Sequence, residues 1–473
     1  MIGVSLFKSI IPFMGFMIAA GHNAYGTEEE SEFRKADGYR GIWYFCNSLK
    51  GKIPYKYSGG LATYCAKHIP LAYYSKEANK TFFVYGGTKG VSEENRLIDM
   101  VSYYDHETHT VPKPTILMEK ETSDGHHNPT IMLDDDGYVW VFVSSHGGKT
   151  GFVYKSRKPY SVDSFQLMER GEFTYPQPWF LEGIGFIHLH TIYHRNHPGG
   201  VRQLFWRTSP DGTDWTEPRK LAAFGGHYQI SWRYKNKVGT AFNYHPNNVD
   251  TRTNLYYVET SDFGKMWHNV SGEQIETPLS SVKNIALVHD YESEGLLVYL
   301  NDINYDSRGN PIIQYVTSPG WHPGPENMPR TWRTARWTGS EWEILTVTES
   351  DNNYDTGSLH IEADDLWRII GPTETGPQPY YPGGEVAIWI SRDKGHSWTK
   401  ERQVTANSPM NHTYVRRPVN AHPDFYAYWA DGNAEKPSDC NIHFADKSGE
   451  KAYVLPRKME ADTEEPTPVT SSR

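Results

Sequence analysis

Three octapeptides of this chain share one pattern, and that pattern constrains the fold more than any other feature. They span Thr208–Trp215, Thr260–Trp267 and Ser391–Trp398. Each has a hydroxyl residue, an Asp, a Gly and a closing Trp in that order, with the Gly three residues before the Trp. The hydroxyl and the carboxylate can bond the backbone of a tight turn, the Gly permits a positive φ, and the Trp packs the hairpin onto its sheet. Three copies predict a repeated β-hairpin architecture.

The octapeptides resemble the Asp-box (BNR) repeats of sialidase-like β-propellers. The remaining chain fits this resemblance, because it is rich in short runs of β-branched and aromatic residues bounded by Gly, Asp and Asn. Tyr138–Val143 and Glu385–Ile390 are typical runs, and no long amphipathic helix is predicted. A propeller blade takes about 40–45 residues, so seven blades need roughly 300 of the 473 residues. One large all-β domain is therefore expected.

The N-terminus resembles a secretory signal peptide. Lys8 precedes an apolar run over residues 10–20, and small and polar residues follow. The run is too short for a stable membrane anchor. We predict a signal peptide over residues 1–26, an N-terminal linker over 27–34, the propeller over 35–459 and a disordered tail over 460–473. The expected location is periplasmic or secreted.

Charge and cysteine content narrow the function classes. The formal net charge is −10 and no basic run occurs, which argues against nucleic acid or an anionic membrane as a partner. An acidic sugar stays open, because a few local cations can hold one carboxylate. The three cysteines are too few for a disulfide framework, and buried free thiols are favoured over a single Cys46–Cys65 bridge.

The first candidate site lies in Tyr57–His68, where Lys67 and His68 follow a glycine-rich turn. A histidine can donate a proton to a leaving glycosidic oxygen, because its pKa lies near working pH. The alternative is a structural histidine bonded to a backbone carbonyl at a blade edge.

The second candidate site combines His126, His146, Tyr193 and Arg207. Residues at equivalent strand starts of successive blades converge on the centre of a propeller, so these four could meet. The set suits a uronate: Arg and His would neutralise its carboxylate, and Tyr or His would remove the C5 proton and protonate the leaving oxygen. The alternatives are a structural metal site and simple hydrogen-bonded histidines.

Five segments resemble the BNR-4 group of bacterial secreted propellers, and most closely its gut Bacteroides α-L-rhamnosidases; they are Gly38–Trp43, Tyr57–His68, Lys80–Gly87, His126–Pro129 and Tyr414–Asp431. The resemblance implies a seven-bladed propeller whose posterior face carries one catalytic histidine, which matches His68. The implied activity is exo-acting removal of terminal rhamnose from the L-rhamnose-α-1,4-glucuronate caps of plant arabinogalactan. In that interpretation His68 is the general acid/base, and Lys67, Arg40 and Tyr64 contact the substrate.

The same group includes ulvan lyases, which cleave a rhamnose–glucuronate linkage by β-elimination at the anterior funnel. Their His, His, Tyr and Arg set corresponds to His126, His146, Tyr193 and Arg207, although the lyases favour Asp-Asp-His where this chain has Asp124-Gly-His. A lyase is therefore the alternative function, and a non-catalytic glycan-binding propeller is a third. The hydrolase interpretation requires no cofactor, while the histidine clusters leave a structural calcium or zinc ion open.

Overall fold

The computed structural model describes residues 33–90, 95–194, 201–363 and 366–469. The predicted signal peptide over 1–26 and most of the predicted linker lie outside the described residues. The unit Phe33–Arg473 is a seven-bladed β-propeller, and the prediction of an all-β, single-domain fold is confirmed. Among the helices of the described residues, none is long and apolar enough to cross a bilayer.

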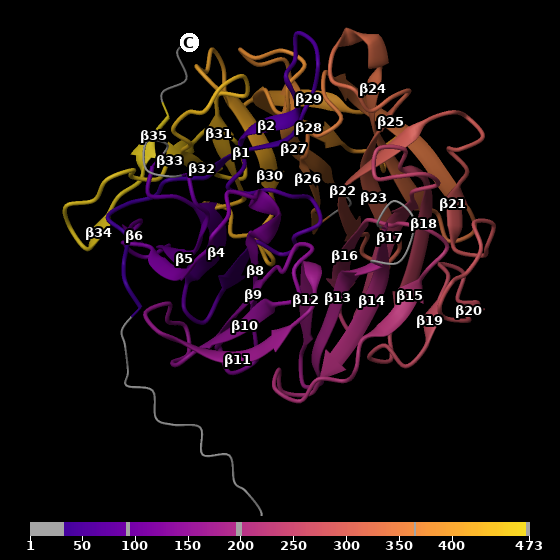
Figure 1. The fold of residues 1–473 in the computed structure, drawn as a ribbon, viewed down its shortest axis with the longest axis horizontal. Coiled ribbons are helices and arrows are strands. Elements are labelled where there is room, and N and C mark those ends of the chain that lie inside the picture. Colours follow the sequence, from indigo (N-terminus) through magenta and orange to yellow (C-terminus); the bar gives the residue numbers. More distant parts are fainter. Residues whose placement is uncertain (1–32, 91–94, 195–200, 364–365, 470–473) are drawn as a thin grey trace, which may run out of the picture. The chain divides into compact units, whose positions relative to one another are not determined.

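The seven sheets follow one another in sequence order, and Figure 1 shows them arranged around a ring. The first blade contains β3 (Ala72–Ser75), β4 (Lys80–Gly87), β5 (Ile98–Asp105) and β7 (Thr115–Glu119). The second contains β8 (Pro129–Leu133), β9 (Val139–Val143), β10 (Gly151–Ser156) and β11 (Phe165–Gly171). The third contains β12 (Thr174–Leu181), β13 (Gly185–His194), β14 (Val201–Ser209) and β15 (Arg219–Ala222).

The fourth blade is the largest, with β16 (Gln229–Tyr234), β17 (Lys237–Tyr244), β18 (Thr253–Thr260), β19 (Trp267–His268), β20 (Gln274–Ile275) and β21 (Leu287–His289). The fifth has β22 (Leu297–Tyr305), β23 (Pro311–Ser318), β24 (Arg330–Trp337) and β25 (Trp342–Ser350). The sixth has β26 (Ser358–Ile361), β27 (Trp367–Glu374), β28 (Glu385–Ser391) and β29 (Thr399–Gln403). The seventh has β30 (Asn411–Arg416), β31 (Ala427–Gly432), β32 (Ile442–Ala445), β33 (Ala452–Val454) and β35 (Thr467–Pro468).

Two small sheets and two short helices complete the described elements. Strand β1 (Trp43–Ser48) pairs with β2 (Tyr55–Gly60), and β6 (Val111–Pro112) pairs with β34 (Thr463–Glu464). The helices are single 3-10 turns, η1 (Gly125–His127) and η2 (Pro325–Asn327).

The three octapeptides form the turns that their sequence predicts. In the second, the Thr260 hydroxyl accepts the N–H of Gly264 at 3.0 Å, and Asp262 accepts two further backbone N–H groups. Gly264 has φ +73°, and a Cβ there would lie 2.8 Å from the indole nitrogen of Trp206 in the preceding blade. The same bonds recur in the other two turns. These turns therefore join blades as well as strands.

The core lies between neighbouring sheets. Six blades each contribute one fully buried indole: Trp140, Trp179, Trp267, Trp332, Trp367 and Trp429, from the second blade to the seventh. All three cysteines are free, and Cys65 and Cys440 are buried, as the sequence predicts. Burial of this aromatic area is the main contribution to the stability of such a core.

The two ends of the described chain close the ring. The first and seventh blades are joined by backbone hydrogen bonds from Tyr74 N to Val419 O and from Val419 N to Ala72 O, both 2.9 Å. The C-terminal segment adds β34 on β6 and β35 on β33. Residues 460–469 therefore differ from the disordered tail that their composition suggests, because unpaired backbone groups of β6 and β33 give them hydrogen-bond partners.

One buried carboxylate should make stability depend on pH. Asp99 in β5 is fully buried, its side-chain oxygens have no hydrogen-bond partner among the described residues, and burial raises its pKa to about 7. This pKa lies above that of an aspartate in the unfolded chain. The free energy of unfolding therefore falls as pH rises from about 4 to about 7. Asp99→Asn removes the titration and should stabilise the protein at pH 8 by on the order of 4 kcal/mol, with little effect at pH 4.

Urea unfolding of both proteins across this pH range measures the difference. Asp136→Asn, at an exposed position, is the control. A constant difference between Asp99→Asn and the wild type from pH 4 to pH 8 would contradict the prediction.

Candidate functional site

A cavity of about 350 Å³ opens where the inner strands of the blades begin. Blades three to seven each contribute one tyrosine, at or just before the first strand: Tyr175, Tyr228, Tyr299, Tyr354 and Tyr414. The second blade contributes His126, and the segment before the first blade contributes Tyr57 and Tyr64. One ring per blade therefore converges on the same space, which is large enough for a sugar residue.

Asp124 organises the polar part of the cavity. It caps η1, between β7 and β8, by accepting the backbone N–H of His126. Its two oxygens also contact two imidazoles, His126 Nδ1 at 2.5 Å and His146 Nδ1 at 2.6 Å. The two rings stack with centroids 4.0 Å apart. The carboxylate thus holds a proton on each Nδ1 and leaves each Nε2 as a hydrogen-bond acceptor.

Both Nε2 atoms accept hydrogen bonds within the cavity. His126 Nε2 lies 2.6 Å from the Tyr64 hydroxyl, and His146 Nε2 lies 2.8 Å from a guanidinium nitrogen of Arg202. Burial lowers the pKa of His146 to about 4 and also lowers that of His126, so both imidazoles are neutral at neutral pH. Burial alone would raise the pKa of Asp124, but the two imidazoles hold it well below its usual range.

The cavity also holds three buried cations. Arg202 in β14 lies over Tyr193 at 4.7 Å, Arg252 lies over Tyr299 at 4.6 Å, and Lys67 lies 5.4 Å from the ring of Tyr228. Among the described residues, none of the three forms an ion pair with a carboxylate. A fourth cation that lines the cavity, Lys56, is also buried but is paired with Asp250.

A buried cation without a counter-ion is unfavourable, and the negative faces of tyrosine rings offset only part of the loss of hydration. Arg202, Arg252 and Lys67 together make the cavity suited to an anionic ligand. The Asp124 carboxylate does not neutralise them, because both of its oxygens are held by imidazoles.

The structure brings three of the four predicted lyase-type residues together: His126, His146 and Tyr193 line the cavity. Arg207 does not, because it pairs with Glu169 and donates to His188 Nδ1 at 3.2 Å. Arg202 occupies the expected place. The two arginines are five residues apart on β14, so their side chains point to opposite faces of the sheet.

Sequence reasoning could have found Arg202 from strand register. Tyr193 and Arg202 are direct partners in the β13–β14 ladder. The ring of tyrosines also had a sequence signal, namely a Tyr beside the first strand of five successive blades. Arg252 had no such signal in the sequence. It follows a loop, and the repeats do not predict the length of that loop.

The residues that the sequence predicted around a posterior site do not all lie together in the structure. Tyr64 and Lys67 line the cavity, whereas His68 is fully buried behind it, with its ring 5.5 Å from that of Tyr175 and neither nitrogen bonded. Burial lowers the pKa of His68 well below its usual value. Arg40 lies elsewhere and pairs with Asp37. His68 and the His126 set therefore share one end of the propeller instead of facing opposite ends.

The Asp124, His126 and His146 cluster is not arranged as a metal site, although its ligand atoms lie within 4.8 Å of one another. Each Nδ1–H donates to the carboxylate, and each Nε2 lone pair accepts a hydrogen bond. A cation would also be repelled by the Arg202 guanidinium. The cluster fixes the protonation states of its two imidazoles.

Residues 99–350, just over half of the chain, match BNR_4, the family described as BNR repeat-containing family members. This chain belongs to that family. The resemblance inferred from the sequence is thereby confirmed at the level of the family.

Curated relatives include an ulvan lyase of Nonlabens ulvanivorans, 22% identical over 344 residues that cover 64% of this chain and 70% of the relative. Another is an ulvan lyase of Alteromonas sp. (strain LOR), 22% identical over 368 residues, covering 67% and 71%. Among solved structures, a PL25 ulvan lyase superposes with a TM-score of 0.67 at 17% identity, covering 91% of this chain and 98% of the other. At this identity the superposition supports the fold.

These findings correct the expected activity. The prediction of a glycoside hydrolase, an exo-acting α-L-rhamnosidase with His68 as acid/base, is contradicted, because the matched curated relatives are lyases. The closeness to Bacteroides rhamnosidases that was inferred from short segments is not shown.

The charge of Lys67 should make anion binding depend on pH. Burial lowers the pKa of Lys67 to about 7, so the amine is protonated below that pH and neutral above it. The two arginines and the carboxylate of a glucuronate probe keep their charges between pH 6 and pH 8. Affinity for glucuronate should therefore fall several-fold over this interval in the wild type.

Lys67→Met should bind glucuronate weakly and with a flat pH profile, as measured by isothermal titration calorimetry. Lys56→Met, which removes a paired cation, is the matched control and should keep the wild-type slope. An unchanged slope in Lys67→Met would show that another group titrates.

Proposed function

We propose that this protein is a polysaccharide lyase that cleaves a uronate-containing chain by β-elimination in the cavity. One observation carries the proposal: Arg202, Arg252 and Lys67, buried without carboxylate partners, meet neutral imidazoles and phenols in one space. Elimination needs a neutralised uronate carboxylate, a base for the C5 proton and an acid for the leaving oxygen. This cavity offers a group for each task.

The lining of the cavity argues against the usual hydrolytic mechanism. Glycosidases commonly use two carboxyl groups about 5 to 9.5 Å apart. Among the described residues that line this cavity there is no Asp or Glu. Asp124 lies behind the two imidazoles and is engaged by both. The cavity therefore lacks the paired carboxylates that hydrolysis would use.

The roles follow from position. Arg202 and Arg252 bind the uronate carboxylate, and the loss of its negative charge makes the adjacent C5 hydrogen more acidic. Tyr193 lies against Arg202, so its side-chain oxygen is next to that hydrogen, and as the phenolate it takes the C5 proton. The electron pair of the C5–H bond forms the C4=C5 double bond, the C4–O4 bond breaks, and Tyr193 returns the proton to O4. Tyr64, held by His126, hydrogen-bonds the sugar.

The substrate we propose is an acidic polysaccharide in which glucuronate is linked to rhamnose. One of the matched solved structures, at a TM-score of 0.66, is a PL25 ulvan lyase bound to -[GlcA(1-4)Rha3S]-. The ring of tyrosines suits such a chain, because flat aromatic faces stack on sugar rings. An exported protein, as the N-terminal sequence suggests, would meet a polymer of this kind outside the cell.

Substitutions on β13 and β14 test the proposal with ulvan as substrate. Arg202→Gln should lower kcat/KM by about 10²- to 10³-fold, because a charge-stabilising group is lost. Tyr193→Phe should lower kcat by about 10²- to 10⁴-fold with a smaller change in KM. The readout is the ultraviolet absorbance of the unsaturated uronate.

Arg207→Lys is the matched control, since Arg207 lies on the same strand but pairs with Glu169 outside the cavity. Its rate should stay near that of the wild type. Near-normal cleavage by Arg202→Gln, or equal losses in Arg202→Gln and Arg207→Lys, would contradict the assignment.

A further inference from the structure

Three clusters of histidine and carboxylate in the described residues have ligand atoms within 4.8 Å of one another. The first, around Asp124, has no free lone pair on its imidazoles, as shown above. The second comprises His412, Asp431 and His443, and the third comprises His106, His422 and Asp424. Hydrogen bonding decides which of them could bind a cation, because a metal needs an unprotonated, unengaged nitrogen.

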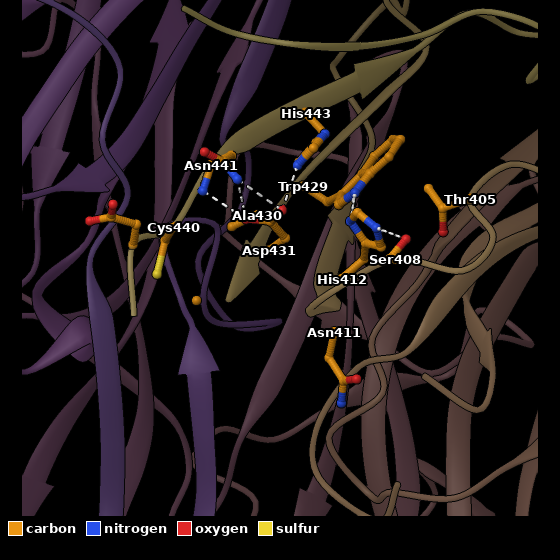
Figure 2. A network of polar contacts seen from close by, with 12 residues as sticks. Thr405, Ser408, Asn411, His412, Trp429, Ala430, Asp431, Cys440, Asn441 and His443 are labelled. Atoms are coloured by element: carbon orange, nitrogen blue, oxygen red, sulfur yellow. Dashed lines mark hydrogen bonds and ion pairs between the residues drawn. The ribbon is translucent and has the colours of Figure 1, made fainter. Parts of the chain in front are cut away.

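Hydrogen bonds engage all three members of the second cluster, as Figure 2 shows, although His443 Nδ1 has no partner among the described residues. His412 Nδ1 accepts the indole N–H of Trp429 at 2.9 Å, so its Nε2 carries the proton and donates to Ser408 at 2.9 Å. Asp431 bonds His443 Nε2 at 3.0 Å and both nitrogens of Asn441. His412 therefore has no lone pair for a metal, and the cluster is a structural network of the seventh blade.

The third cluster combines a buried imidazole that has an unpartnered nitrogen with two members that are partly or fully exposed. His106 is only 7% exposed, its Nε2 bonds the Thr81 hydroxyl at 2.8 Å, and its Nδ1 is buried without a partner. With the proton on Nε2, the Nδ1 lone pair is unengaged. An unsatisfied buried nitrogen is unfavourable by itself, and a cation bound beside His422 and Asp424 would satisfy this one.

The other two members can move to meet a cation. The ring of His422 stacks on that of His106 with centroids 3.9 Å apart, and the Asp424 carboxylate lies 3.8 Å from His422 Nδ1. The side chains of His422 and Asp424 are 24% and 52% exposed. Among the described residues, His422 Nδ1 accepts a long, 3.2 Å hydrogen bond from the backbone N–H of Asp424, and rotation of this half-buried imidazole would free the lone pair. Small rotamer changes can therefore bring the three atoms closer.

We propose that His106, His422 and Asp424 form a binding site for a divalent transition-metal ion, with zinc as the preferred ion. Two imidazoles and one carboxylate are a donor set that zinc accepts at about 2.0–2.2 Å, with water completing the tetrahedron. His106 follows β5 in the first blade, whereas His422 and Asp424 lie between β30 and β31 in the seventh. The ion would join the two blades at which the ring closes.

Metal titration of the full chain, stripped with chelator, tests the site without using enzyme activity. Calorimetry with zinc chloride measures stoichiometry and affinity, the visible spectrum with cobalt reports the ligand geometry, and thermal unfolding reports stability. His422→Ala and Asp424→Asn change exposed side chains and should leave folding intact. His396→Gln, at an exposed histidine of the sixth blade, is the control.

The wild type and His396→Gln should bind one zinc that His422→Ala does not bind, and zinc should raise their melting temperature. Asp424→Asn should weaken that binding by at least the roughly tenfold expected for loss of a supporting group. The site is refuted if the wild type binds no zinc, or if His422→Ala and Asp424→Asn retain its stoichiometry and affinity. Neither result depends on whether the protein cleaves a polysaccharide.

Discussion

The inner strands of all seven blades begin at one end of the ring, and this constraint determines which residues meet. Residues as distant in sequence as Tyr64, in the segment before the first blade, and Tyr414, in the first strand of the seventh, lie with their rings 5.0 Å apart. The hairpin turns, the buried indoles and the paired ends of the chain maintain the ring. The cavity is thus a consequence of blade repetition, and its chemistry depends on the residue that each blade places there.

Three buried cations, unpaired among the described residues, make the cavity suited to anionic ligands. The propeller buries Arg202, Arg252 and Lys67 without carboxylates and surrounds them with tyrosine faces, an arrangement that is unfavourable until an anion enters. Two carboxylates near the cavity are already engaged: Asp124 holds two imidazoles in a fixed protonation state, and Asp250 pairs with Lys56. The site is therefore suited to a negatively charged ligand, which the proposed elimination from a uronate requires.

The sequence predicted the architecture because the determinants of the turns are local. The Thr260–Trp267 turn needs only its own hydroxyl, carboxylate and glycine, so eight residues suffice to recognise it. His126, His146 and Tyr193 were found for a related reason, since they lie at strand ends that a propeller brings together. The failures involve pairing across strands: the choice between Arg202 and Arg207 depends on the register of β14, which composition does not reveal.

Two other errors arose from long-range contacts. Residues 460–469 have the composition of a flexible tail, yet β6 and β33 offer them backbone partners far away in sequence. His68 was matched to a catalytic residue by a short motif, but its burial behind Tyr175 depends on the packing of the third blade. The activity inferred from that motif was wrong, whereas the cavity chemistry inferred from the histidines, the tyrosine and an arginine led to the alternative.

The course of the cleavage reaction is the most direct test of the account. Ulvan is digested in water enriched in heavy oxygen, and the oligosaccharides are analysed by mass spectrometry. Elimination predicts products with an unsaturated uronate at the non-reducing end and no heavy oxygen introduced at the cleaved bond. Saturated products that carry one heavy oxygen per cleaved bond would contradict it, because water would then have broken the linkage.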